Sequence, residues 1–164
     1  MKYYMCIRAT FLILATLIAA APCAAETKTP KALVGRWTVM KSLDRGKPQA
    51  ADEMRVDIEF TSSQLEMRMY LRSEERPREP THVYDCDFTS KNGLLMLDMK
   101  TAENNPGPET GIHICTIYKI DGDTLTICSG HTEDPKSVGV RPTKFVSSPE
   151  TQSDLNVLKR QNPN

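Results

Sequence analysis

Apolar and polar side chains alternate along most of this 164-residue chain, and that period of two constrains the fold more than any other feature. Residues 54–60 read MRVDIEF, and residues 65–71, after a polar turn, read LEMRMYL. Successive side chains of a β-strand point to opposite faces, so each segment presents one apolar face and one polar face. Strands with a single buried face are typical of antiparallel sheets.

The same pattern along the rest of the chain predicts about eight short strands, separated by turns and polar loops. The expected strands are 34–41, 54–60, 65–71, 82–88, 94–99, the two arms of a hairpin within 111–128, and 154–160. No segment has the spacing of a convincing amphipathic helix. We therefore expect an all-β antiparallel fold, a barrel or a sandwich. We favour the barrel because closure leaves no exposed strand edge.

The N-terminus has the composition of a secretory signal peptide. Two cationic residues precede an uncharged apolar run, residues 9–21, which is shorter than the roughly 20 residues that span a membrane. The expected organisation is a signal peptide (1–25), a linker (26–31) and a single β-barrel domain (32–161). We expect export to the periplasm or extracellular space of a bacterium. The alternatives are a retained N-terminal anchor and a lipid anchor at Cys23.

Composition and charge exclude several functional classes. Hydrophobic residues make up 39% of the chain, which is ordinary for a folded domain, and 21 basic residues balance 21 acidic ones. Loss of residues 1–25 removes two positive charges, so the mature balance is 19 against 21, a net charge of −2. A nucleic-acid-binding protein normally has a basic surplus, so we expect no nucleic-acid partner. We also expect no membrane span in the mature protein, which we take to be a monomer.

The clearest hairpin has an Asp-Gly dipeptide at 121–122, which favours a tight type I′ turn. With that turn, Ile120 pairs with Asp123. The apolar face of the hairpin then holds Tyr118, Ile120, Leu125 and Ile127. On the other face Cys115 lies opposite Cys128, at a pair whose Cα atoms approach to about 4.5 Å. An exported protein meets an oxidising compartment, so this register predicts a Cys115–Cys128 disulfide.

Two alternatives to that disulfide remain open. Cys86 fits a buried free thiol on an apolar strand face, but it could instead pair with Cys115 or Cys128. A metal site could use His113, Cys115, Cys128 and His131, because two cysteines and two histidines can bind zinc tetrahedrally. Otherwise the two histidines are ordinary surface residues, and we expect no cofactor.

No residue pattern in the sequence indicates an enzymatic activity. No HExxH, GxSxG, Walker or GxGxxG motif occurs. Asp85 and Asp87 could serve acid–base chemistry, but their alternation around Cys86 fits the solvated face of a strand. We leave an enzymatic activity open and favour a non-enzymatic protein.

Several motifs in the second half of the chain resemble one family. These are residues 117–125 (IYKIDGDTL), Cys128, residues 141–145 (RPTKF) and residues 158–160 (LKR), after an opening LVGRW segment at 33–37. Together they resemble an uncharacterised conserved domain of exported planctomycete proteins, over about residues 32–160. Thr116 replaces a glycine that is usual in that domain. The resemblance implies architecture and export, and no particular activity.

The pair Gly35-x-Trp37, together with Arg160, is similar to lipocalin-like barrels. In those barrels a first-strand tryptophan closes one end and a late arginine packs on its ring, a cation–π contact of roughly 0.5–2 kcal/mol. The resemblance implies a lipocalin-like barrel of about eight strands, with Trp37 and Arg160 in structural roles. An ordinary buried tryptophan near an arginine is the alternative. We assign structural roles to Cys115 and Cys128 from the hairpin register.

Eight-stranded barrels can hold one small ligand, so the fold implies a binding module for a small apolar or amphipathic molecule. Candidate cavity residues are Met67, Met69, Tyr84 and Tyr118, although methionines at such positions also serve as core filling. The first alternative is a protein-interaction or inhibitor-type envelope domain that acts through loops 73–80 and 129–140. The second is a metal-binding protein.

Overall fold

The computed structural model describes residues 28–49, 53–108, 110–130 and 138–162. The predicted signal peptide and His131 lie outside the described residues. The described residues form no helix, so none is present there that is long and apolar enough to cross a membrane. The strands are β1 (Gly35–Asp44), β2 (Lys47–Pro48), β3 (Met54–Phe60), β4 (Gln64–Leu71), β5 (His82–Lys91), β6 (Leu94–Thr101), β7 (His113–Asp121), β8 (Thr124–Gly130) and β9 (Ser153–Arg160).

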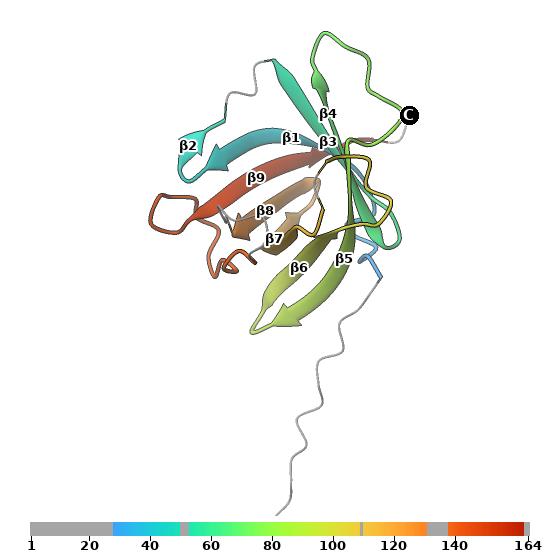
Figure 1. Cartoon of the computed structure of the whole chain (residues 1–164). Coiled ribbons are helices and arrows are strands. Elements are labelled where there is room, and N and C mark those ends of the chain that lie inside the picture. The colour runs from blue at the N-terminus through green and yellow to red at the C-terminus, as the bar shows by residue number, and fades with distance from the viewer. Residues whose placement is uncertain (1–27, 50–52, 109, 131–137, 163–164) are drawn as a thin grey trace, which may run out of the picture.

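The strands form one antiparallel sheet in which each strand from β3 to β8 pairs with the one that follows it (Figure 1). β1 pairs with both β3 and β9, so the sheet closes into an eight-stranded barrel. β2 is a two-residue extension that pairs only with β1. The all-β, antiparallel, lipocalin-like barrel predicted from the alternation and the resemblance is therefore confirmed.

Tight turns connect neighbouring strands where the sequence has residues that tolerate positive φ. Arg45-Gly46 and Asn92-Gly93 both have positive φ at their two central positions, as a type I′ turn requires. Each turn fixes the register of its hairpin, with Asp44 opposite Lys47 in one case and Lys91 opposite Leu94 in the other. These local signals account for the β1–β2 and β5–β6 hairpins.

The register predicted for the β7–β8 hairpin is wrong by two residues. Asp121 pairs with Thr124, so the two-residue turn is Gly122-Asp123, with positive φ at the glycine. Glycine at the first central position is the signature of a type II′ turn. The predicted core face is unchanged, because a shift of two residues keeps each side chain on its own face. Cys128 instead lies opposite Ile117, which removes the geometric basis of the predicted disulfide.

One end of the barrel, which we call the sealed end, is closed by large apolar side chains. Leu33, just before β1, is fully buried together with Trp37 of β1. The Trp37 indole nitrogen donates a 2.8 Å hydrogen bond to the Leu33 carbonyl oxygen. Phe60 and Leu65 cover the same region from the β3–β4 hairpin, each only 1% exposed. Burial of each of these side chains contributes roughly 1.5–3 kcal/mol to the stability of the fold.

Residues 138–152, which precede β9 and have no regular structure, cover part of the outer face of the barrel. They lie so close to the end of β8 that a Cβ on Gly130 would be 2.0 Å from the Val140 carbonyl oxygen. Only glycine fits this approach. Further on, the Val146 carbonyl oxygen accepts hydrogen bonds from Cys128 and from Ser153. This cover explains why Ile117 and Cys128, both on the outer face, are fully buried.

Candidate functional site

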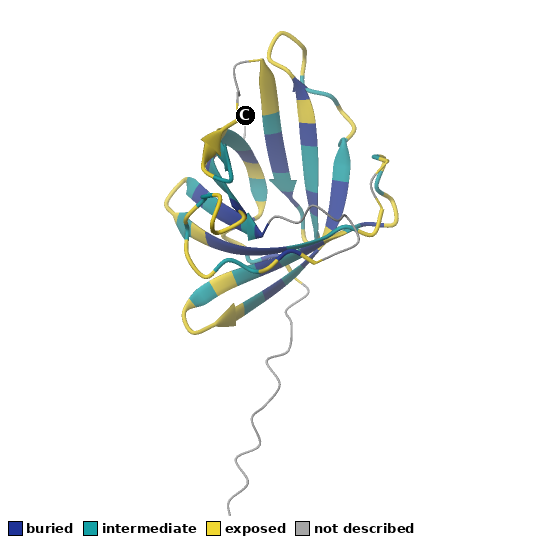
Figure 2. Ribbon diagram, turned by 60° about the vertical axis from the view of Figure 1, so that its left-hand side comes forward, coloured by how far each residue is buried: buried dark blue, intermediate teal, exposed yellow. Residues whose placement is uncertain are grey.

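A row of apolar side chains runs along the inner face of the β3–β4 hairpin and emerges into solvent. From the sealed end outward, its cross-strand pairs are Phe60–Leu65, Ile58–Met67, Val56–Met69 and Met54–Leu71. The first pair is 1% exposed at both positions, whereas Met54 is 36%, Met69 40% and Leu71 41% exposed. We call the end of the barrel that holds these three residues the open end. Figure 2 shows the same gradient, with the start of β3 exposed and its end buried.

The row is exposed because β4 loses its neighbour on one side. β4 pairs with β5 only from Gln64 to Met67. Thr81, just before β5, makes the last contacts there, donating from its backbone nitrogen and its hydroxyl to the Met67 carbonyl oxygen. Beyond Met67 the hairpin therefore continues without a paired strand on its β5 side. The residues on its inner face there are still apolar, but they are partly exposed to solvent.

Of the four residues predicted to line a ligand cavity, the two methionines lie in this row and the two tyrosines lie in the core. Met69 belongs to the exposed part of the row, and Met67 is half-buried against the core. Tyr84 and Tyr118 are only 5% and 4% exposed. Tyr118 meets the Phe88 ring edge-on, with centroids 6.2 Å apart, which is a core contact. Tyr84 stacks with His82, the first residue of β5, at 6.3 Å.

Met54 and Leu71, the outermost pair of the row, were not singled out from the sequence. Both belong to the alternating segments that predicted the strands, so the pattern identified their face. It did not identify their exposure, which depends on how far β5 extends alongside β4.

The outer face of the same hairpin holds a buried polar cluster centred on Asp57. Its carboxylate accepts hydrogen bonds from the Tyr70 hydroxyl at 2.7 Å and the Thr38 hydroxyl at 2.8 Å. It also pairs with Arg55 at 3.2 Å and Arg76 at 3.3 Å. Burial by itself raises the pKa of Asp57, but the two hydroxyl hydrogen bonds and the Arg55 charge outweigh it and hold the pKa below its usual value. Arg76 also fastens loop 73–80, the predicted interaction loop, to the barrel.

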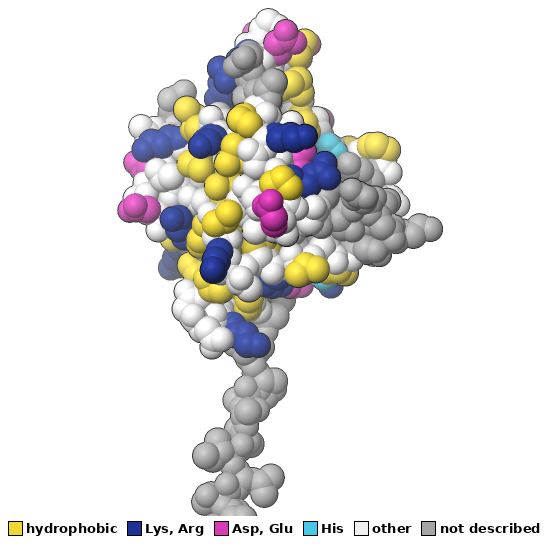
Figure 3. Space-filling model, turned by 90° about the vertical axis from the view of Figure 1, so that its left-hand side faces the viewer, with side chains coloured by type: hydrophobic (Ala, Val, Ile, Leu, Met, Phe, Trp, Pro, Cys, Tyr) yellow, Lys and Arg dark blue, Asp and Glu magenta, His cyan; other side chains and the backbone are white. Residues whose placement is uncertain are grey.

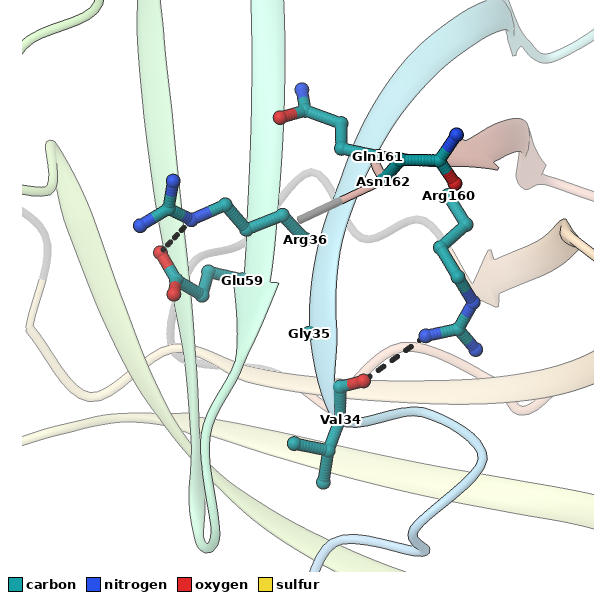
Figure 4. A pocket seen from close by; sticks show the side chains of 7 residues that line it. All are labelled: Val34, Gly35, Arg36, Glu59, Arg160, Gln161 and Asn162. Atoms are coloured by element: carbon teal, nitrogen blue, oxygen red, sulfur yellow. Dashed lines mark hydrogen bonds and ion pairs between the residues drawn. The ribbon is translucent and has the colours of Figure 1, made fainter. Parts of the chain in front are cut away.

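A hollow of about 540 Å³ at the sealed end is lined by residues with structural roles (Figure 4). Arg36 forms an ion pair with Glu59 at 3.2 Å. Arg160 donates to the Val34 carbonyl oxygen at 3.1 Å, and its guanidinium lies 4.1 Å from the centroid of the Trp37 ring. This is the contact that the resemblance to lipocalin-like barrels predicts. Both arginines that line the hollow are therefore engaged with other groups of the protein.

The face over β1 and β9 carries exposed apolar side chains that are interspersed with lysines and arginines (Figure 3). Met40, in the bulge of β1, is 65% exposed, and Val146 is 47% exposed. The basic side chains divide the apolar area, so it lacks the continuity that marks a binding patch.

The three cysteines of the described residues are free thiols, which corrects the predicted disulfide. Burial, together with the charge of Asp85, raises the pKa of Cys86 to about 12, so it stays an unreactive thiol in the core. Burial also raises the pKa of Cys128, whose Sγ lies 3.6 Å from the Val146 carbonyl oxygen. Cys115 lies elsewhere on the outer face, next to Asp98.

The residues that the structure brings together as potential metal ligands differ from those predicted. Among the described residues, Asp98, His113 and Cys115 bring potential ligand atoms within 4.8 Å of one another. Cys128 is not part of that group, and His131 is outside the described residues. Asp98 was not predicted because it lies on β6, and only the β6–β7 pairing places it opposite Cys115.

Comparisons with models of protein families, with curated proteins and with solved structures gave no match. The resemblance to the exported planctomycete domain therefore stays a prediction. Function must be argued from the geometry of the barrel itself.

Proposed function

We propose that this protein is an exported, non-enzymatic barrel that binds a small apolar or amphipathic molecule at its open end. The proposal is carried by the apolar row, whose exposure increases from 1% at Phe60 to 41% at Leu71. Exposed apolar side chains that continue from a barrel core are typical of a ligand entrance. Export is part of the proposal and is supported by the composition of residues 1–25.

The chemistry of the row fits a ligand of variable shape. Met54, Met67 and Met69 are unbranched, flexible and polarisable, so they can adapt to different apolar groups. Removing their exposed area from water would contribute roughly 25 cal/mol per Å² of apolar surface. His82 stacks on Tyr84 and pairs with Met67, so an aromatic ring lies beside the row. A predominantly apolar molecule is therefore the favoured ligand class.

Titration with a fluorescent apolar probe, N-phenyl-1-naphthylamine, tests this proposal. Two leucines provide a matched pair, because Leu71 and Leu95 are each 41% exposed. Leu95 lies two residues from the β5–β6 turn, which is at the opposite end of the barrel from the start of β3 (Figure 1). We expect saturable binding that Leu71→Glu weakens about tenfold, or roughly 1.4 kcal/mol. Leu95→Glu should change the Kd less than about twofold.

Native mass spectrometry of the protein purified from its own cells identifies the ligand class directly. A retained small molecule that is absent from the Leu71→Glu variant supports the proposal. Absence of saturable probe binding, or an equal loss of affinity in both variants, contradicts binding at the open end.

A further inference from the structure

The outer face of β6 and β7 brings together three side chains with different donor atoms. Asp98 of β6 is directly opposite Cys115 of β7, and His113 is two residues before Cys115. Leu97 and Met99, which flank Asp98, belong to the core, and Ile114, between His113 and Cys115, packs against it, so strand alternation places all three on the outer face. The cluster is thus separated from the inner apolar row by the thickness of the sheet.

The three side chains are close enough to share one ion. A carboxylate oxygen, an imidazole nitrogen and the Cys115 sulfur all lie within 4.8 Å of one another. Ligands of a tetrahedral zinc ion are about 2.0–2.3 Å from the metal, and hence roughly 3.3–3.8 Å apart. Side-chain rotations that move the donor atoms by about 1 Å would bring them to these separations without moving the strands.

A second observation also indicates a ligand at this position. The Nε2 atom of His113 is buried and has no hydrogen-bond partner among the described residues. Buried polar atoms nearly always have a partner, and imidazole nitrogen is the commonest protein ligand for transition metals. Cys115 beside it is also buried. A metal ion bound through Nε2 would supply the partner that this nitrogen lacks.

Arg141 orients the carboxylate of this cluster. Its guanidinium donates to one oxygen of Asp98 and, at 2.6 Å, to the Thr116 carbonyl oxygen. The second carboxylate oxygen remains as a ligand, and hydrogen bonding to the first is the usual arrangement around a metal-binding carboxylate. The guanidinium charge opposes a cation, so a thiolate ligand has to supply much of the affinity.

We propose that Asp98, His113 and Cys115 form a binding site for one zinc-like transition-metal ion. The set contains one oxygen, one nitrogen and one sulfur donor, which suits Zn²⁺ and excludes Mg²⁺ and Ca²⁺, whose ligands are oxygens. Three protein ligands leave the fourth position of a tetrahedral ion to solvent. The site is independent of the proposed ligand-binding function at the open end.

Titration of the reduced, metal-free protein with Co²⁺ tests the site, because Co²⁺ adopts zinc geometry and reports sulfur ligation in its spectrum. We expect a thiolate-to-cobalt charge-transfer band that saturates at one equivalent and disappears when Zn²⁺ is added. Cys115→Ser should abolish the band. His113→Ala and Asp98→Asn should weaken Co²⁺ binding by more than the roughly 10–100-fold that loss of an outer-shell partner costs.

Matched variants of the same residue types serve as controls. Cys128→Ser and His82→Ala remove a thiol and an imidazole outside the cluster, so each should leave the band and the stoichiometry unchanged. Circular dichroism of every variant checks that the barrel is folded. A saturating band that survives Cys115→Ser would overturn the assignment, as would the absence of any charge-transfer band in the unchanged protein.

A measurement on the unchanged protein keeps the test valid if a variant does not fold. Alkylation of Cys115 by iodoacetamide, followed by peptide mass spectrometry, should slow at least tenfold when Zn²⁺ is present. Mg²⁺ in place of Zn²⁺ provides the reference and should not slow the reaction, because the donor set excludes Mg²⁺. Equal rates for Cys115 with and without Zn²⁺ contradict the site.

Discussion

The two ends of the barrel are stabilised in different ways, although the same β3–β4 hairpin passes through both. At the sealed end the hairpin buries Phe60 and Leu65 inside the barrel, against Trp37. Toward the open end its inner face is exposed, and the polar cluster around Asp57 holds its outer face. The hairpin can therefore leave Leu71 in solvent, because hydrogen bonds and ion pairs on its other side partly replace the lost apolar burial.

The largest expected effect is the loss of the sealed end. Trp37→Ala removes a fully buried indole, its hydrogen bond to Leu33 and its contact with Arg160. We expect the free energy of unfolding to fall by about 3–5 kcal/mol, measured by urea denaturation. Trp37→Phe is the milder variant if the alanine protein does not fold. A loss below about 1 kcal/mol for the alanine variant would show that the stability of the sealed end does not depend on the buried indole.

An intermediate effect is expected at the polar cluster. Asp57→Asn removes the charge that pairs with Arg55 and Arg76, and we expect a loss of about 1–3 kcal/mol at pH 7. Because the pKa of Asp57 is lowered by folding, its carboxylate stabilises the protein above the usual aspartate pKa, and this contribution is lost as pH falls through the lowered value.

Thermal unfolding between pH 7 and pH 3 tests that dependence. The Tm difference between the unchanged protein and Asp57→Asn should be largest near neutral pH and should shrink at the acidic end. A difference that stays constant over this range would show that protonation of Asp57 does not weaken the cluster, and would contradict stabilisation by its charge.

The smallest effect is expected for Leu71, and Leu65 provides the matched comparison on the same face of β4. Leu65→Ala should cost about 2–5 kcal/mol, because the side chain is 1% exposed. Leu71→Ala, at 41% exposure, should change the free energy of unfolding by less than about 0.5 kcal/mol. Urea denaturation of the two variants measures both values. A large cost at Leu71 would mean that the open end also depends on apolar packing.

Much of the fold could be predicted because its signals are local. The alternation from Met54 to Phe60 identifies both a strand and its buried face. The Asn92-Gly93 dipeptide has the positive φ values of a tight turn and connects β5 to β6, between the strands predicted at 82–88 and 94–99. Such features depend on the steric preferences of a few neighbouring residues, so they can be deduced without the rest of the molecule.

The β7–β8 register shows where that reasoning fails. Both Asp121-Gly122 and Gly122-Asp123 are acceptable two-residue turns, and the two registers differ by two residues. A shift of two preserves the inward face, so the apolar pattern does not distinguish them. The structure combines the second register with pairing of β7 to β6 and of β8 to β9. The predicted Cys115–Cys128 pairing depended on the first register and fails with it.

The two candidate sites also depend partly on local sequence features and partly on non-local strand pairing. The sequence by itself determined the strands, their inner and outer faces, and the presence of His113 and Cys115 on one face, because these depend on the two-residue period of a strand. Only the tertiary structure decided that Asp98 joins those two residues and that Leu71 extends beyond β5. Both depend on how far strands slide past one another when the barrel closes, and that offset is set by non-local pairing around the whole sheet.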